Sequence, residues 1–173
     1  MRFRWILAAA AGGAMLVSVV PARAQLTPEP MGLLIRAGFF MPASGAGGAF
    51  GSSWFAAGAE MDLFRPGFGF IPIPLQPKIT LSVDAYNKSG VSAAPVLLNL
   101  RIKQGALRFS GGLGVAFADT PDTDASLEFA YQFSAGYDLP WLGLPLTAEL
   151  RFFGVQGVGT ALDGFAMTLG FRL

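Results

Sequence analysis

The sequence predicts an all-β fold, an eight-stranded antiparallel up-and-down transmembrane β-barrel preceded by a cleavable signal peptide. Three observations lead to this class. Eight segments alternate apolar with small or polar residues, turn-rich segments join them, and charged residues are scarce. Only 13% of the 173 residues are charged, whereas 53% are hydrophobic. Because a soluble domain usually carries about 25% charged residues, this chain has too few charges to cover a water-facing surface.

The first 24 residues have the layout of a secretory signal peptide. Arg2 and Arg4 form a basic start, an apolar run extends from Trp5 to Val20, and Ala24 ends an Ala-Arg-Ala cleavage motif. The alternative is an uncleaved membrane anchor, but the run is short and rich in Ala and Gly. We therefore expect a signal peptide over residues 1–24 and a barrel domain over residues 25–173.

The chain that would remain after cleavage carries a slightly negative net charge, so it is not a basic protein. Removing three arginines from the 12 basic residues leaves 9 against 11 acidic ones, a net charge of −2. The remaining charges form no basic patch, so we do not expect nucleic acid as a partner. Beyond the leader, no apolar run approaches the roughly 20 residues of a membrane helix.

Alternation with a period of two defines the strands, because successive side chains of a strand point to opposite faces. The clearest case is SLEFAYQFSAGYDL, over residues 126–139, in which every second residue is apolar or aromatic. The other predicted strands cover residues 31–41, 54–63, 78–86, 96–103, 107–118, 146–153 and 164–173. No long helical period separates them, so neighbours should pair antiparallel, and closure into a barrel removes the exposed edges.

The small size of the residues on the polar face indicates that this face points inward. It is mainly Gly, Ala and Ser, with a few long charged residues. An eight-stranded barrel is only wide enough for side chains to fill it, so glycines there leave room for arginines and glutamates. The bulky apolar face then suits hydrocarbon, and strands of about ten residues match a membrane-spanning barrel. A soluble lipocalin-like barrel is the alternative, but it would need many charges on its exterior.

With these features the chain resembles the small eight-stranded outer-membrane barrels, such as the OmpA transmembrane domain, OmpX and OmpW. The resemblance covers residues 25–173 and rests on the pattern. Its most specific element is the last strand, GFAMTLGFRL, which is similar to the signal that the barrel-assembly machinery recognises. The family usually ends on an aromatic residue, whereas this chain ends on Leu173 after Phe171.

The resemblance implies location, topology and partners. It places the protein in the outer membrane of a diderm bacterium, in contact with outer-membrane lipid, with Phe165 to Leu173 recognised by the assembly machinery. The sequence leaves the oligomeric state open, and we favour a monomer. Both termini should be periplasmic. The long connection from Phe64 to Pro77 does not fit a short periplasmic turn, so either its aromatics (Phe64, Phe68, Phe70), with Tyr137 and Trp141, lie at the membrane interface or the strand boundaries differ there.

Charged residues on the inward face form a candidate lumen network. The candidates are Arg36, Glu60, Asp62, Asp84, Arg101, Arg108, Glu128, Asp138, Glu149, Arg151 and Arg172, joined by Lys78 and Lys103. The signs nearly balance, whereas an ion-selective pore prefers one sign. Because an unpaired buried charge costs several kcal/mol, we expect ion pairs and a closed lumen. A hairpin register should bring Arg36 near Glu60 and Arg108 near Asp138.

A second inward set is apolar and lies near the extracellular strand ends. It contains Phe40, Trp54, Tyr86, Leu97 and Phe153. These residues are either a packed lid that closes the barrel or, as in an OmpW-like barrel, a site for small hydrophobic molecules.

Catalysis and metal binding are not expected. The enzymes among the small outer-membrane barrels are alike in needing a catalytic histidine, and this chain has no histidine and no cysteine. Asp119, Asp122 and Asp124 in DTPDTD could ligate calcium through hard oxygens, but the spacing fits a surface turn better. We expect no cofactor and a structural or loop-presenting barrel; the alternatives are a barrel for small hydrophobic molecules and a soluble secreted carrier.

Overall fold

The computed structural model describes residues 32–49, 51–66, 76–88, 90–121, 123–139, 143–157 and 160–173. Several expectations lie outside this part of the chain. They are the signal peptide over residues 1–24, the aromatic side chains of Phe68, Phe70 and Trp141, residues 67–75 of the long connection, Asp122, and the side chain of Asp124.

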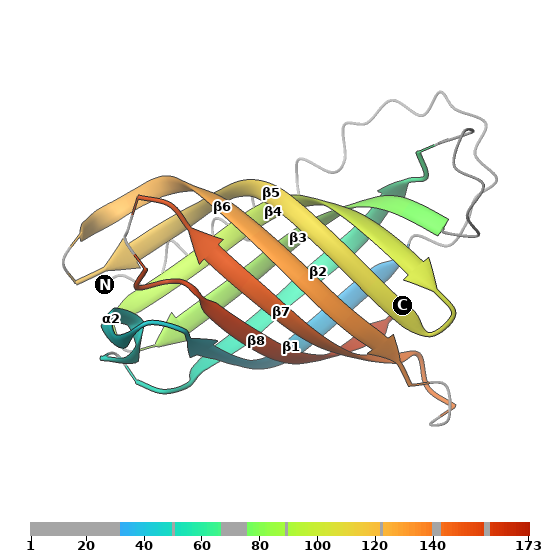
Figure 1. Cartoon of the computed structure of the whole chain (residues 1–173), viewed down its shortest axis with the longest axis horizontal. Coiled ribbons are helices and arrows are strands. Elements are labelled where there is room, and N and C mark those ends of the chain that lie inside the picture. The colour runs from blue at the N-terminus through green and yellow to red at the C-terminus, as the bar shows by residue number, and fades with distance from the viewer. Residues whose placement is uncertain are drawn as a thin grey trace.

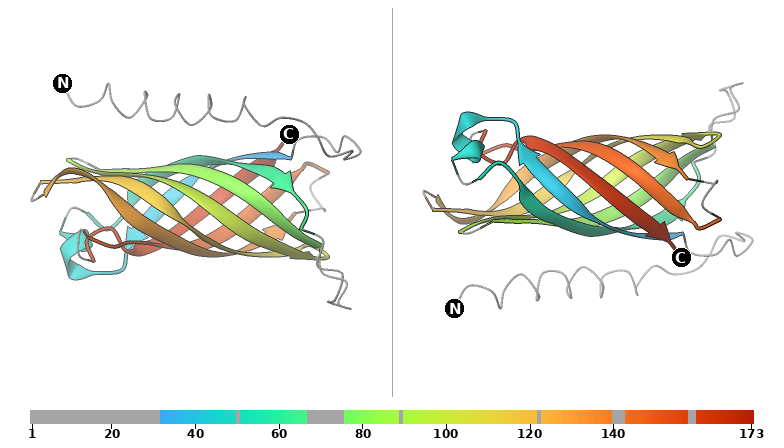
Figure 2. Two further views of the ribbon diagram at one scale, coloured as in Figure 1. Left: turned by 90° about the horizontal axis from the view of Figure 1, so that it is seen from above. Right: turned by 90° about the horizontal axis from the view of Figure 1, so that it is seen from below.

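Eight antiparallel strands close into one barrel (Figures 1 and 2). The elements are β1 (Leu33–Pro42), α2 (Gly45–Gly48), β2 (Trp54–Phe64), β3 (Gln76–Lys88), β4 (Val91–Gln104), β5 (Leu107–Thr120), β6 (Thr123–Asp138), β7 (Leu146–Val155) and β8 (Gly164–Arg172). Each strand pairs with the next, and β8 pairs with β1 from Leu34↔Arg172 to Pro42↔Gly164. The predicted all-β, eight-stranded, up-and-down barrel is therefore confirmed.

The barrel has two distinct ends. At the end that we call the terminal end, β1, β3, β5 and β7 begin and β2, β4, β6 and β8 stop. The opposite end, the loop end, carries α2 between β1 and β2 and the β3–β4, β5–β6 and β7–β8 connections (Figure 1). No helix in the described ranges is long and apolar enough to cross a membrane.

Two segments between predicted strands, residues 87–95 and 119–125, are largely strand in the structure. The first, NKSGVSAAP, contains a tight turn at Gly90, whose φ of 85° suits glycine. Strand β4 already begins at Val91. Likewise β5 extends to Thr120, and β6 begins at Thr123. Both hairpins therefore reach beyond the range that side-chain alternation predicted, because the pairing of backbone groups does not require large apolar side chains.

The outward face of the barrel is apolar, as the alternation predicted. Phe39, Phe133 and Leu113 are 64%, 60% and 59% exposed. Large exposed apolar side chains also include Ile35, Phe55, Leu98, Phe109, Val115, Phe117, Leu127, Phe129, Leu150, Phe165, Met167, Leu169 and Phe171. The inward positions between them are buried, and many of these are polar or charged.

Candidate functional site: the barrel interior

Arg36, Asp84 and Arg151 form the centre of an interior network. Arg36 lies on β1 and donates from Nε and Nη2 to the two carboxylate oxygens of Asp84 on β3, at 2.9 and 2.7 Å. Arg151 on β7 donates from Nη1 to Asp84 Oδ2 at 2.6 Å. Asp84 therefore joins guanidinium groups from two other strands across the lumen. Such bidentate, charge-assisted contacts are the strongest hydrogen bonds that side chains make.

Glu60 and Glu149 extend this network. Arg36 Nη1 lies 2.8 Å from Glu60 Oε2, and Arg151 Nη2 lies 2.7 Å from Glu149 Oε1. Arg101 forms ion pairs with both Glu60 and Asp62, the latter at 2.7 Å, and so connects the centre of the barrel with its terminal end. Since each of these buried charges has an oppositely charged partner, the desolvation cost of the interior is offset by pairing.

Neutral polar residues fill the lumen beside these charges. Asn99 donates from Nδ2 to Ser82 Oγ at 3.0 Å, and Gln132 donates to Asn99 Oδ1 and to Ser82 Oγ. Thr80 donates to Glu60 Oε1 at 2.5 Å. The sequence analysis did not select Thr80, Asn99 or Gln132, although each lies at an inward position of the predicted alternation. Extending the candidate set to uncharged polar residues would have found them.

Glycines on the inward face make space for the long side chains. Gly58 on β2 pairs with Asp84 on β3, and a side chain at Gly58 would collide with the Asp84 carboxylate. Gly112 on β5 pairs with Asn99 on β4, and its missing side chain leaves room for the Asn99 amide in the same way. Small residues on the inward face thus allow polar side chains to lie across neighbouring strands.

The five inward residues of the apolar set come together as one layer near the loop end. The ring centroids of Phe40 and Trp54 are 5.1 Å apart, those of Phe40 and Tyr86 4.9 Å, and those of Tyr86 and Phe153 4.9 Å. Leu97 belongs to the same buried cluster, and all five side chains are at most 2% exposed. Leu162, from the β7–β8 connection, is also buried in this cluster. Alternation could not have identified Leu162, because it lies outside a strand.

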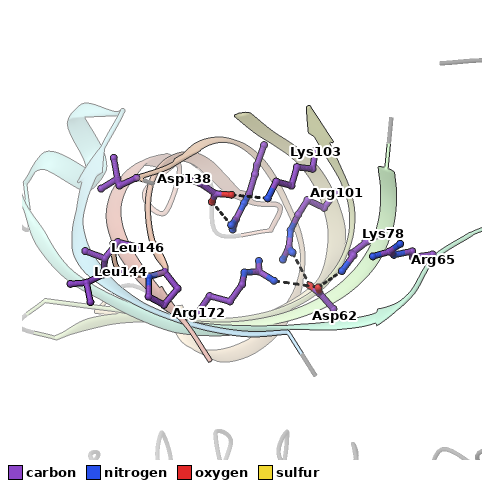
Figure 3. Close-up of a pocket in the computed structure, with 12 residues that line it drawn as sticks. Asp62, Arg65, Lys78, Arg101, Lys103, Asp138, Leu144, Leu146 and Arg172 are labelled. Carbon is purple, nitrogen blue, oxygen red and sulfur yellow. Dashed lines mark hydrogen bonds and ion pairs between the residues drawn. The ribbon is translucent and has the colours of Figure 1, made fainter. Parts of the chain in front are cut away.

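The terminal end of the lumen holds an open cavity of about 400 Å³, which we call the vestibule. Within the described ranges, six basic residues line it: Arg65, Lys78, Arg101, Lys103, Arg108 and Arg172. Its two carboxylates are Asp62 and Asp138, and its apolar wall is formed by Leu139, Leu144, Pro145 and Leu146. Figure 3 shows the charged side chains arranged around the opening, with Asp62 and Asp138 on different walls.

Each vestibule carboxylate is shared by more than one cation. Asp62 Oδ2 lies 2.8 Å from Lys78 Nζ and 3.3 Å from Arg172 Nη1, in addition to the contact of Asp62 with Arg101. Asp138 pairs with Lys103 at 2.9 Å and with Arg108. The two hairpin pairs expected from register, Arg36 with Glu60 and Arg108 with Asp138, are thus both ion pairs in the structure.

Glu128 lies apart from this network. It is inward on β6, but it pairs in register with Ala116, closer to the loop end than Gln132. A side chain at Gly157, in the β7–β8 connection, would meet the Glu128 carboxylate. None of the ion pairs among the described residues includes Glu128. In register it lies closer to the loop end than Arg108 and Arg151, among Ala116, Ala118 and Ala130 of the apolar cluster, a depth that its inward parity alone did not reveal.

Comparisons with known proteins assign no family to the chain, and the described residues show no metal-binding group. No protein-family model, curated protein or solved structure matches the chain significantly. Within the described residues, no group of three or more acidic, histidine or cysteine side chains is arranged to hold a metal ion. The interior can therefore be interpreted only from its own geometry: a packed apolar layer, a paired polar centre and a cationic vestibule.

Proposed function

We propose that the protein is a non-enzymatic, integral outer-membrane β-barrel with a closed lumen, which stabilises the membrane or presents its loops at the cell surface. One observation carries this proposal. The closed barrel has its large apolar side chains on the outside and its charges on the inside, which is the reverse of a water-soluble barrel.

The apolar exterior has no plausible partner in water. Soluble monomers rarely expose contiguous apolar patches larger than a few hundred Å², whereas here Phe39, Leu113, Phe133 and Met167 represent a surface found around much of the barrel. Hydrocarbon removes the cost of exposing these side chains. Strands of 9 to 16 residues are long enough to cross a bilayer when tilted, since about 9–11 residues suffice.

The small barrels that this chain resembles lie in the outer membrane, which is therefore the membrane that we propose for it. The leader-like residues 1–24 and the alternating last strand, with Phe165, Met167, Leu169 and Phe171 all outward, support export and recognition by the barrel-assembly machinery. We infer a monomer, because a closed barrel has no free strand edge through which to pair.

Two barriers support a closed lumen. The aromatic layer of Phe40, Trp54, Tyr86 and Phe153 fills the section near the loop end, and the ion pairs of Asp84 fill the section below it. The same pairing disfavours acid–base catalysis, because carboxylates held by arginines are poor proton carriers.

The alternative functions require features that the described residues do not favour. A passage for small hydrophobic molecules would need an opening between aromatic rings whose centroids lie 4.9 to 6.4 Å apart. A soluble carrier would need a charged exterior and an apolar ligand cavity. The carrier therefore disagrees with an exterior of phenylalanine and leucine around a charged interior.

The test is electrophoretic mobility of the membrane-fraction protein in detergent, with and without boiling. We expect the protein to resist carbonate and urea washes of the membrane and to migrate faster before boiling than after it, because a closed barrel stays compact in detergent. A protein that washes off, or whose mobility does not change on boiling, would contradict the proposal.

A further inference from the structure

We propose that the vestibule is a binding site for a small, water-soluble, multivalent oxyanion of the phosphate class. The inference goes beyond the structural role proposed above, and it depends on the barrel interior rather than on the surrounding membrane. It rests on the shape of the cavity, on the sign of its charges and on a buried arginine N–H that has no acceptor.

The cavity has a suitable size and is open to water. Its volume of about 400 Å³ lies within the usual range for small-ligand sites, roughly 300–1,000 Å³. It opens at the terminal end, where Lys103 is 44% and Leu144 55% exposed. On its inner side the ion pairs of Glu60 with Arg36 and Arg101 close it. A ligand would therefore enter along the barrel axis from water and stop at the network.

Positive charge predominates among the vestibule residues. The described lining has six basic and two acidic side chains, and the acidic ones already contact Lys78, Arg101 and Arg172 on one wall and Lys103 and Arg108 on the other. A concave site lined by one sign of charge and enclosed by low-dielectric walls concentrates the opposite ion. The excess cations thus specify an anion, and their number favours a multivalent one.

Arg172 has a buried hydrogen-bond donor that lacks an acceptor, which is the most direct argument for an anionic ligand. Its Nη1 lies 3.3 Å from Asp62 Oδ2, a long contact, and its Nε is buried without a hydrogen-bond partner. Arg101 and Arg108, which carry the same charge as Arg172, line the same cavity. A buried N–H without an acceptor costs free energy, and a phosphate oxygen would supply that acceptor and offset the repulsion.

The geometry favours phosphate-class chemistry over a simple halide. Arg101, Arg108 and Arg172 line the vestibule from β4, β5 and β8 with planar guanidinium groups. Figure 3 shows those of Arg101 and Arg172. Guanidinium donors match oxyanions in a forked, bidentate geometry that a spherical ion does not use. Cations lie beside both Asp62 and Asp138, so pyrophosphate, which carries two phosphate groups, is a suitable probe.

The test is isothermal titration calorimetry of sodium pyrophosphate into the full chain, folded in a neutral detergent at low ionic strength. The variants are Arg172→Gln and Lys103→Gln. Each removes one cation but leaves Asp62 or Asp138 with another basic partner, so both should fold. Lys88→Gln is the matched control, because it removes the same charge near the loop end, where Lys88 pairs in register with Val91.

We expect saturable binding to the unaltered chain that weakens with added salt. Each vestibule variant should weaken it by about fivefold or more, since a charge-assisted hydrogen bond typically contributes that much, whereas Lys88→Gln should leave it unchanged. If only one of the two vestibule variants folds, that variant still decides the comparison.

Two results would overturn the inference. One is no binding heat up to about 10 mM pyrophosphate, or equal weakening by Lys88→Gln. The other is binding of dihexanoyl phosphatidate about tenfold tighter than pyrophosphate, which would assign the cations to a lipid headgroup instead of a soluble anion. A chain that shows the heat-dependent mobility shift yet binds no pyrophosphate would leave the membrane-barrel proposal intact.

Discussion

At the scale of single residues, Asp84 has the most connected position in the interior. Its carboxylate accepts hydrogen bonds from Arg36 and Arg151, which lie on β1 and β7, and all three side chains are almost fully buried. Removing one partner of a buried ion pair costs far more than removing both, because the remaining charge keeps its desolvation penalty. The energetic effect of a charge in this lumen should therefore depend on its depth.

Asp84→Asn and Asp138→Asn test this dependence on depth with the same chemical change. Asp84→Asn should lower the free energy of unfolding by about 3 kcal/mol, because it leaves two buried arginines short of a carboxylate. Asp138→Asn should cost about 1 kcal/mol or less, since the Asp138 side chain is 19% exposed at the vestibule. Urea unfolding in detergent measures both. Equal losses would show that depth does not decide the energetics of these pairs.

Gly58→Val tests the close approach of the Asp84 carboxylate to β2. The new side chain would occupy the space of that carboxylate and push it from its arginines, so we expect a loss of about 1–3 kcal/mol, typical of overpacking. Ala57→Val is the control, because Ala57 directly precedes Gly58 in β2 and faces outward. The same urea titration gives both values, and a loss at Ala57 as large as that at Gly58 would contradict the explanation.

At the scale of elements, alternation predicted all eight strands because one face of each strand is consistently apolar. It failed where that contrast fades. Val91–Pro95 begins β4 with Ser, Ala and Pro, and Thr120 and Thr123 flank a turn, so backbone pairing extends these strands without a side-chain pattern to reveal it. The four-residue helix α2 is shorter than any helical period can indicate.

Leu113→Arg tests the proposed membrane exposure of a strand face. Leu113 lies near the middle of β5, is 59% exposed and points outward. In a bilayer, arginine at mid-depth costs about 2–4 kcal/mol, falling to about 0–1 near the interface. We therefore expect Leu113→Arg to destabilise the reconstituted protein by the larger amount and Leu107→Arg, at the β4–β5 turn, by the smaller. Similar small effects at both positions in lipid vesicles would favour a barrel surrounded by water.

At the scale of the whole molecule, the numbers of positive and negative side chains in the lumen are nearly equal, but the excess of positive charge lies at the terminal end. The centre pairs Arg36 and Arg151 with Glu60, Asp84 and Glu149, whereas the vestibule is mainly basic. Hairpin register was enough to predict the pairs between neighbouring strands, Arg36 with Glu60 and Arg108 with Asp138. It could not predict that Arg151 meets Asp84 or that Glu128 lies apart, because contacts across the lumen depend on how the closed barrel staggers its strands.

This separation into sections leads to a prediction for conductance. The unaltered protein should show no stepwise current in planar lipid bilayers, because the aromatic layer and the Asp84 network each block the lumen. Phe153→Ala should lower stability by about 3–5 kcal/mol, since Phe153 is fully buried against Tyr86. It should nevertheless stay non-conducting, because Arg36, Asp84 and Arg151 still span the section below.

The conductance measurement needs a matched variant that leaves the lumen intact. Phe133→Ala removes the same ring from the outward face, where Phe133 is 60% exposed, and should also remain silent. Discrete current steps from Phe153→Ala but not from Phe133→Ala would mean that the aromatic layer alone closes the barrel. In that case the polar centre would be a water-filled path rather than a plug, because ion pairs that span a lumen tightly leave no continuous column of water for ions to follow.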